Sequence, residues 1–349
     1  MTKKQTNMTQ LSIIVPVYNV ENFIRPCIES IFNQGLDESC FEVIIVNDGT
    51  EDKSMEMIAD IIKIHNNITV INQENQGVSV ARNNGIEVAK GQYILMIDSD
   101  DLLIENSLKP VLEIANKTQV DIVVADYLIM TNDEIKNLKS ICQEDFTIRE
   151  MSGEHFFEKE LDPRECYIWH ILFKREFLID EKMRFYPGIR YQDVPFIHEC
   201  YLKANKCLKI SLFLIVYRKW SGASTSSFDI KKAKDFSIAI SKTWDLTQLK
   251  GLSQAVDFKL REDVWTSFCL IVFLICRGLP NSSERNTAID YLRGCAPNLY
   301  FKNGAKQHFL SFLFYKMPHA LIKLRYYYGI IFEDRIIPYS RHILKRLFR

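Results

Sequence analysis

The sequence lacks an excess of charge of either sign and an apolar run long enough to cross a membrane. Among 349 residues, Lys plus Arg equals Asp plus Glu at 44 each, so composition gives no electrostatic reason to expect nucleic acid as a partner. The longest apolar run, Val264 to Cys276, is shorter than the ~20 residues of a membrane-spanning helix and predicts a buried helix. The first ten residues are polar, so we expect no signal peptide.

The sequence also lacks a CxxC pair and any cysteine at zinc-type spacing with histidine. Its nine cysteines are scattered and odd in number, which favours small buried thiols in reduced cytosol. Pairing of some of them in an oxidising compartment is the alternative. Hydrophobic residues make up 47% of the chain, enough for a substantial core.

The first half of the chain alternates short apolar runs with segments of helical spacing, which predicts an α/β fold. The expected sheet is mostly parallel with helices on both faces, and binding sites in such sheets lie outside the carboxyl ends of the strands. Strands are expected at 11–17, 41–46, 68–71, 93–97 and 120–125, and helices at 24–32, 55–62 and 78–90, the last stopped by Gly91.

The pattern changes after Ser140, where aromatic and charged residues are mixed irregularly. The small polar residues 221–227 predict a loop or linker, and the chain from Asp229 onward is expected to be mainly helical. We therefore predict a catalytic domain over 1–228 and a helical C-terminal domain over 229–349.

The strongest candidate site is the acidic turn Asp98-Ser99-Asp100-Asp101, directly after the apolar strand expected at 93–97. Mg²⁺ and Mn²⁺ prefer oxygen ligands and usually take one or two carboxylates together with substrate phosphates. Such a cation neutralises a diphosphate leaving group as its bond to a sugar breaks. The alternative is a strand end whose aspartates cap the next helix. The buried strand before this DxD motif favours a metal site.

Two further polar segments follow the expected strands. Asp48, in the segment 47–50, could accept the N3–H of a uracil, although an ordinary Asp-Gly turn explains the same residues equally well. Gly77 opens a helix whose early turns carry Arg82, so backbone N–H groups and a cation are offered to a nucleotide or phosphate. A surface arginine is the alternative for Arg82.

Two other nucleotide-binding classes are excluded by the end of the first strand. It runs into Tyr18-Asn19-Val20-Glu21 and not into GxGxxG, so a nicotinamide dehydrogenase is excluded. A nucleotidyltransferase that forms sugar nucleotides would need a glycine- and arginine-rich loop after this strand, and none is present.

Four segments together resemble the successive motifs of family 2 glycosyltransferases with the GT-A fold. They are similar in order and spacing, and the resemblance covers about residues 10–225; the segments are 12–19, 46–50, 75–83 and 98–101. The resemblance implies an inverting enzyme that uses a nucleotide-sugar donor, often UDP-linked, with Mn²⁺ or Mg²⁺. It also implies a glycan or lipid-linked acceptor in cell-surface polysaccharide synthesis. A catalytically inactive, GT-A-like protein that binds nucleotide sugars or acts as a scaffold is the alternative.

The resemblance assigns expected roles to individual residues. It implies that Asp48 binds the base, together with Pro16 and Tyr18. The donor-side role of Arg82 rests on its own segment and not on the resemblance. The resemblance also implies that the first aspartate of the acidic turn, 98, lies by the ribose and that Asp100 meets the metal.

The general base is expected at Asp193. Many family members carry Glu-Asp before an apolar helix, where this chain has Gln192-Asp193, so any role of the first acid is in doubt. Displacement with inversion needs one base opposite the leaving group, and partial burial would raise the pKa of this carboxyl towards the working pH. A helix N-cap is the alternative role for Asp193.

Four weaker contacts with acceptor or diphosphate are predicted. Trp169 and His170 stand where relatives often have Trp-Asn, with a buried core tryptophan and a structural histidine as the alternatives. Arg218 and Ser224 lie in a segment that resembles the family's closing segment near the diphosphate.

The last part of the chain is basic and aromatic. From 302 to 349 it has ten basic residues against Glu333 and Asp334, mixed with many Phe and Tyr. Such a segment predicts peripheral contact with an anionic membrane, which places the protein in the cytoplasm at the inner face of the cell membrane. The alternative is that its apolar residues pack on the catalytic domain and its cations face water.

Overall fold

The computed structural model describes residues 9–138, 141, 143, 145–220, 227–301 and 304–328. By its internal contacts the chain divides into two units. Unit 1 comprises 1–160, 167–188 and 200–220, and unit 2 comprises 161–166, 189–199 and 221–349. Each is described by itself, and the domain boundary predicted near 228 stays a prediction.

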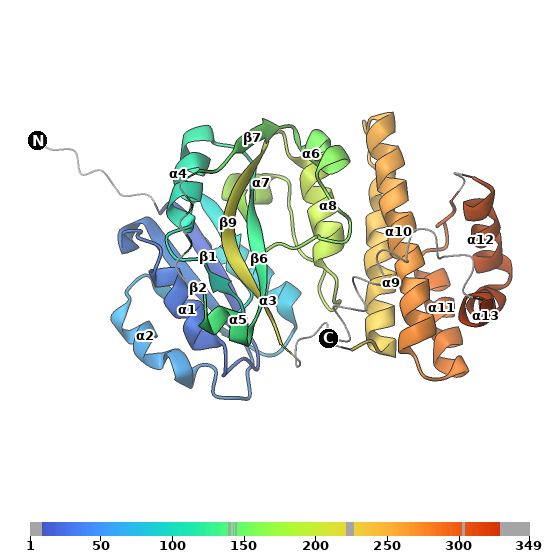
Figure 1. Cartoon of the computed structure of the whole chain (residues 1–349), viewed down its shortest axis with the longest axis horizontal. Helices are drawn as coiled ribbons and strands as arrows, with labels where there is room; N and C mark the ends of the chain where they lie inside the picture. Colours follow the sequence, from blue (N-terminus) through green and yellow to red (C-terminus); the bar gives the residue numbers. More distant parts are fainter. Residues whose placement is uncertain are drawn as a thin grey trace, which may run out of the picture. The chain divides into compact units, whose positions relative to one another are not determined.

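Unit 1 is built on a sheet of nine strands, counted over the described residues, in the order β3-β2-β1-β4-β8-β6-β9-β5 with β7 on β9 (Figure 1). The strands are β1 (Leu11–Val17), β2 (Phe41–Asp48), β3 (Ile68–Gln73), β4 (Tyr93–Met96), β5 (Leu102–Leu103), β6 (Ile122–Thr131), β7 (Ile148–Met151), β8 (Ile171–Lys174) and β9 (Cys207–Lys219). Strands β1 to β4 pair in parallel, as does β6 with β9. Strands β5, β7 and β8 run antiparallel to their neighbours. The predicted α/β fold is confirmed, with antiparallel strands that the sequence did not predict.

The helices of unit 1 follow the expected alternation. They are α1 (Ile24–Phe32), α2 (Ala59–Ile64), α3 (Val78–Val88), α4 (Leu108–Thr118), α5 (Asn132–Lys136), α6 (Gly153–Lys159) and α7 (Arg175–Asp180), with 3₁₀ turns η1 (Glu38–Cys40) and η2 (Glu56–Ile58). The single helix predicted over 55–62 is therefore a 3₁₀ turn followed by a short α-helix. Helix α3 ends at Val88, before Gly91. A Cβ on Gly91 would lie 2.3 Å from the backbone nitrogen of Ser12, so this glycine permits a close approach to β1.

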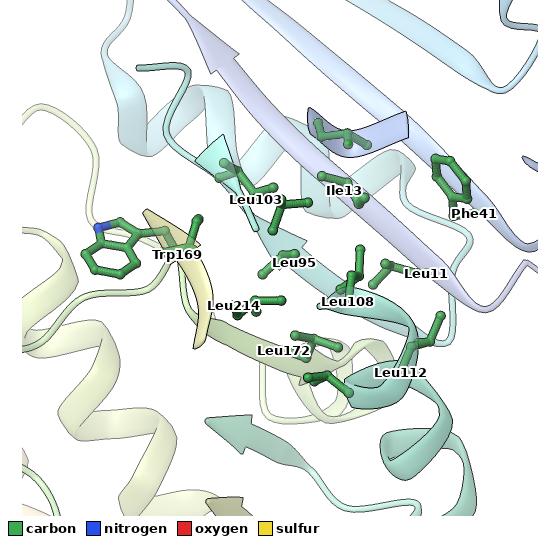
Figure 2. Close-up of a cluster of buried hydrophobic side chains, with 14 of the residues drawn as sticks. Leu11, Ile13, Phe41, Leu95, Leu103, Leu108, Leu112, Trp169, Leu172 and Leu214 are labelled. Carbon is green, nitrogen blue, oxygen red and sulfur yellow. The ribbon is translucent and has the colours of Figure 1, made fainter. Parts of the chain in front are cut away.

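The core of unit 1 lies on both faces of the sheet. Ile13 and alternate residues of β1 pack in a cluster with α1 and α4, which includes Leu108 and Leu112 (Figure 2). Ile14 points to the other face, where its side chain meets Gly85 of α3. Because both faces are covered, the parallel strands are continuous apolar runs, and polar residues are left at their ends.

Unit 2 is mainly helical. Its helices are α9 (Ile230–Asp245), α10 (Gln254–Gly278), α11 (Ser282–Cys295), α12 (Ala305–Lys316) and α13 (Pro318–Tyr328), with the 3₁₀ turn η3 (Leu246–Gln248); α8 (Asp193–Lys203) begins in this unit and ends in unit 1. The run Val264 to Cys276 lies within α10, and most of its side chains are buried, as predicted. In the described part of the chain, no helix has the length and hydrophobicity to span a membrane.

Candidate active site

The end of β2 is tied to the loop before α3 by Asp48. Its buried carboxylate accepts hydrogen bonds from Gln73 Nε2 and Gln76 N, both at 2.8 Å, and from Gly77 N at 2.9 Å. Gly77 has φ 87°, a backbone conformation that glycine adopts without strain, and α3 begins at the next residue. Asp48 therefore fixes the start of α3 and keeps some acceptor capacity for a ligand.

Arg82 joins α3 to the acidic turn. Its side chain is buried, and Nη2 donates to Asp98 Oδ1 at 2.5 Å. The guanidinium carbon lies 5.5 Å from the ring centroid of Phe185, and Nε has no hydrogen-bond partner among the residues that the structure describes. Arg82 is therefore a buried cation beside the acidic turn, and the surface position considered as the alternative is wrong.

The end of β9 is built onto the acidic turn. Arg218 donates from its backbone nitrogen to Asp101 Oδ1 at 2.8 Å and from Nε to the carbonyl of Asp100 at 2.7 Å. Its Nη1 donates to Asn132 Oδ1 at 2.7 Å, and Trp220 Nε1 donates to Asp100 Oδ2 at 2.9 Å. Neither Trp220 nor Asn132 was predicted from the sequence. Only Trp220 had a signal in the sequence. It lies two residues after the predicted contact Arg218, and side chains two residues apart in an extended strand lie on the same face.

Two carboxyls of the acidic turn, those of Asp100 and Asp101, have a raised pKa. Burial is the largest cause for Asp100 and Asp101, and the negative charges of neighbouring aspartates add to it. Asp101 Oδ2 is buried and has no hydrogen-bond partner within the described part of the chain. A bound cation would relieve both conditions. Among the described residues, no three His, Cys, Asp or Glu side chains group so that they could hold a metal by themselves.

Pro16 and Tyr18 lie at the neighbouring end of β1, where Pro16 is buried and Tyr18 is exposed. The backbone nitrogen of Asn19 donates to Thr50 Oγ1 at 2.8 Å and thereby joins the ends of β1 and β2. The structure thus brings the predicted donor-side residues of β1, β2, α3 and the β4 turn to one edge of the sheet, as the rule for parallel strands predicts.

Trp169 and His170 precede β8 in an aromatic cluster. Trp169 is buried and contacts the rings of Tyr167 and Tyr217, with centroids 5.0 and 5.4 Å away, and these two tyrosine rings also contact one another. His170 Nδ1 lies 2.6 Å from the carbonyl of Ala125 and so carries the proton, and burial lowers the pKa of His170 to about 4. Both residues match the structural alternatives, and their contact with an acceptor stays a prediction.

The predicted base, Asp193, is the first residue of α8 and is partly buried in unit 2. Its negative charge lies near Cys166, where it adds to burial in raising the pKa of that thiol. The neighbouring Gln192 is buried, and its Oε1 has no hydrogen-bond partner. The last predicted contact, Ser224, lies outside the described residues.

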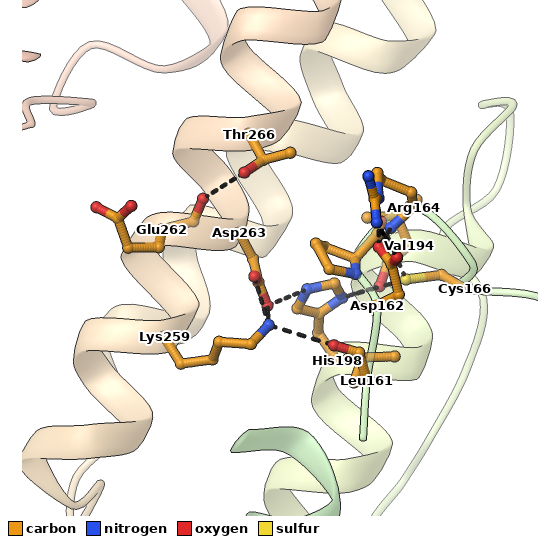
Figure 3. Close-up of polar contacts among 11 residues, drawn as sticks. Leu161, Asp162, Arg164, Cys166, Val194, His198, Lys259, Glu262, Asp263 and Thr266 are labelled. Carbon is orange, nitrogen blue, oxygen red and sulfur yellow. Dashed lines mark hydrogen bonds and ion pairs between the residues drawn. The ribbon is translucent and has the colours of Figure 1, made fainter. Parts of the chain in front are cut away.

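A polar network within unit 2 fixes the first turns of α8 (Figure 3). His198 Nδ1 lies 2.8 Å from the carbonyl of Val194, and Nε2 lies 3.5 Å from Asp263 Oδ2 on α10. Both oxygens of Asp263 accept from Lys259 Nζ, which also donates to the carbonyl of Leu161 at 3.3 Å. The network therefore ties the turn that carries the predicted base to α10.

Comparison with known proteins points to the family that the motifs resemble. Residues 12–176 match the sequence model of Glycosyl transferase family 2. The glycosyltransferase GlyG of Streptococcus pneumoniae is 29% identical over 259 residues, which cover 70% of this chain and 83% of GlyG. EpsJ of Bacillus subtilis, described as an uncharacterized glycosyltransferase, is 33% identical over 211 residues, but the match covers only 61% of EpsJ.

Solved structures agree at the level of the fold. TarS of Staphylococcus aureus, residues 1–349 with UDP-GlcNAc, superposes with a TM-score of 0.65 at 18% identity, covering 96% of this chain and 92% of that one. The mannosyltransferase PcManGT of Pyrobaculum calidifontis, with GDP-Man and Mn²⁺, superposes with a TM-score of 0.54 at 14% identity. The match covers 93% of this chain and 89% of that one. The chain therefore has a GT-A-like fold, and its residues 12–176 resemble glycosyl transferase family 2.

Proposed function

We propose that this protein is a metal-dependent, inverting glycosyltransferase that moves a sugar from a UDP-linked donor to a hydroxyl of a glycan or lipid-linked oligosaccharide. One observation carries the proposal. Asp48 holds the start of α3, Arg82 of that helix is paired with Asp98, and the charge of Asp98 acts on Asp100, so residues of three separate segments lie at the carboxyl edge of the sheet. The UDP-GlcNAc in the TarS structure supports the choice of donor class.

The residues of the acidic turn fit a divalent cation. Asp100 is the proposed ligand, and the crowded charge of the turn together with the unpartnered Asp101 Oδ2 would be relieved by a positive ion. Mg²⁺ or Mn²⁺ needs only one or two carboxylates when diphosphate oxygens complete its coordination. When bound there, the cation would neutralise the charge that develops on the departing diphosphate.

The remaining roles are assigned to four other residues. Asp48 offers its carboxylate to the N3–H of the base, and the exposed ring of Tyr18 is available to the same base. Arg82 holds Asp98 in place beside the ribose. Asp193 takes the proton of the acceptor hydroxyl as the new glycosidic bond forms.

Two substitutions test the division of roles. Asp100→Asn is expected to weaken metal-dependent UDP binding by at least tenfold and to abolish transfer, because a carboxylate ligand is lost. Asp193→Asn is expected to leave UDP affinity nearly unchanged while kcat falls by about 10²-fold or more, because only the proton acceptor is lost. Calorimetric titration of UDP with Mn²⁺, beside an assay of transfer, separates the two effects.

Asp133→Asn is the matched control, because Asp133 is an exposed carboxylate on α5. Asp133→Asn should change neither the affinity for UDP nor kcat. Equal loss of UDP affinity in the Asp100 and Asp193 variants would contradict the separate roles. Binding of UDP and Mn²⁺ by the parent protein, without turnover on any acceptor, would instead support the scaffold alternative.

We further propose peripheral contact with the inner face of an anionic membrane, where a lipid-linked acceptor would lie. Helix α12 exposes Phe309 and Phe312 on one face, at 49% and 48%, with exposed Lys316 one turn later. Its other face packs inside unit 2, where Phe314 contacts Phe268. Part of α12 therefore packs within unit 2 itself, which leaves the alternative of packing on the catalytic domain untested, and part offers aromatic rings and cations to a surface.

A further inference from the structure

Trp220 makes a hydrogen bond to the proposed metal ligand. Its Nε1 donates to Asp100 Oδ2 at 2.9 Å, across 120 residues of sequence. An indole N–H is only a donor, whereas a carboxylate has about four acceptor positions. The bond therefore uses one position of Asp100 and leaves others for a cation.

The indole ring is held by its own neighbours. Phe23, which precedes α1, lies against Trp220 with ring centroids 4.6 Å apart. Phe23 also contacts the guanidinium of Arg218, which lies 5.1 Å from the ring centroid. Arg218 is in turn fixed by hydrogen bonds to the acidic turn, including one to Asp101. The donor to Asp100 is therefore part of a packed cluster and does not rotate independently.

We infer that Trp220 is a positioning residue, whose N–H fixes the orientation of the Asp100 carboxylate and so sets the direction in which its remaining lone pairs meet a divalent cation. The inference rests on the proposed function, because it needs a cation at Asp100. Hydrogen bonds from the outer shell of a metal site orient the ligand and raise its affinity for the metal. The bond also couples the end of β9 to the acidic turn, since Trp220 directly follows Lys219, the last residue of that strand.

The test is Trp220→Phe, which removes the N–H and keeps an aromatic ring against Phe23. Calorimetric titration of Mn²⁺ into protein with UDP should show an affinity lowered roughly tenfold or more. UDP affinity in EDTA and the melting temperature without ligand should stay close to those of the parent protein. These two measurements separate a positioning role from a general loss of structure.

Tryptophan fluorescence gives a second readout that does not depend on turnover. Paramagnetic Mn²⁺ bound at Asp100 should quench the emission of the adjacent Trp220 in the parent protein, and Trp220→Phe should lack that quenching. Trp244→Phe is the control, because Trp244 lies in unit 2 against Phe301 and should leave the quenching in place.

The outcomes separate this inference from the function beneath it. If Asp100→Asn loses metal-dependent UDP binding while Trp220→Phe keeps the parent affinity for Mn²⁺, the positioning role is overturned and the proposed function stands. Tighter Mn²⁺ binding by Trp220→Phe would mean that the indole competes with the cation, which also overturns the inference. If Asp100→Asn binds Mn²⁺ and UDP like the parent, the metal site itself is wrong.

Discussion

Burial favours the neutral form of two unlike groups in unit 1. It lowers the pKa of His170 to about 4, and it raises the pKa of Asp101. The same desolvation therefore moves a base and an acid in opposite directions. Their contributions to the pH dependence of stability also have opposite signs. A substitution of His170 therefore removes the contribution of the histidine and leaves that of the acids in place.

Replacing His170 should flatten the dependence of stability on pH. The folded pKa lies below the ordinary value of 6.5, so between these values the unfolded chain binds more protons. The stability associated with neutral His170 is complete above pH 6.5 and is lost as pH falls towards 4, by up to about 3 kcal/mol. His170→Asn keeps a donor for the carbonyl of Ala125 but does not titrate, and urea unfolding in EDTA from pH 7 to 4.5 should show the shallower decline.

The comparison needs a histidine outside the core. His155 is exposed on α6, so His155→Asn should reproduce the pH dependence of the parent protein. A parallel decline in the His170 variant and the parent would contradict the assigned pKa.

At the scale of elements, α3 and β1 approach closely at a single glycine. A Cβ on Gly85 would lie 2.4 Å from Cγ2 of Ile14, a core side chain that is completely buried. Because Cγ2 is attached directly to the β carbon, it cannot move without rotating the whole side chain. The distance between α3 and the sheet, and with it the place of Arg82, therefore depends on the missing methyl group.

The substitution Gly85→Ala should destabilise the protein, although alanine is the better helix former. Overpacking costs about 1–3 kcal/mol, which outweighs the gain in helix propensity of about 1 kcal/mol. Gly294→Ala is the matched control, because Gly294 lies in α11 with nothing within 4 Å of its added Cβ. The control should stabilise by about 0.5 kcal/mol. Denaturant unfolding measures both, and the same sign in both variants would contradict the packing argument.

Elements defined by local patterns could be predicted from the sequence. Continuous apolar runs gave β1 to β4, and helical spacing gave α1 and α3, within a few residues of their observed bounds. Strands β5 and β7 could not be predicted, because each is short and pairs with a distant partner. Leu102 lies opposite Val216, and Ile148 lies opposite Ile210.

The candidate site likewise contains residues that local patterns place and contacts that local patterns do not predict. The positions of Asp48 and Asp100 followed from a general rule about strand ends, so one sequence was enough to place them. The contacts of Asp100 with Trp220 and of Arg218 with Asn132 join segments 120 and 86 residues apart. Such contacts depend on how β9 pairs with β5 and β6, which no local pattern specifies.

At the scale of the whole molecule, a neutral total charge conceals an uneven distribution. Acidic and basic residues are equal in number over the chain, yet no acidic residue occurs from 291 to 332. This stretch includes α12 and α13, which expose Lys316 and Lys323. Cations without neighbouring acids in sequence, beside exposed aromatic rings, favour an anionic lipid surface over a neutral one.

The double substitution Phe309→Ser/Phe312→Ser should abolish most membrane binding. The parent protein is expected to sediment with vesicles that contain phosphatidylglycerol and not with pure phosphatidylcholine vesicles. Loss of two rings that enter the interface should lower partitioning by roughly tenfold or more, since each buried ring contributes about 1.5–3 kcal/mol at full burial. UDP binding should be unchanged, because both rings lie in unit 2, outside the network around Asp100.

An exposed ring elsewhere in unit 2 shows whether position or mere hydrophobicity matters. Phe258 on α10 is 56% exposed, more than Phe309 or Phe312, so Phe258→Ser removes an exposed ring comparable to either one of the two on α12. If α12 is the membrane-binding face, this variant binds vesicles as the parent protein does. A higher salt concentration then weakens vesicle binding of both proteins alike, because it screens the charges of the lysines. Equal losses of vesicle binding in the two variants would show nonspecific adsorption. If the parent protein did not bind anionic vesicles, the proposed membrane contact would be wrong, and the proposed sugar transfer at the sheet edge would be unaffected.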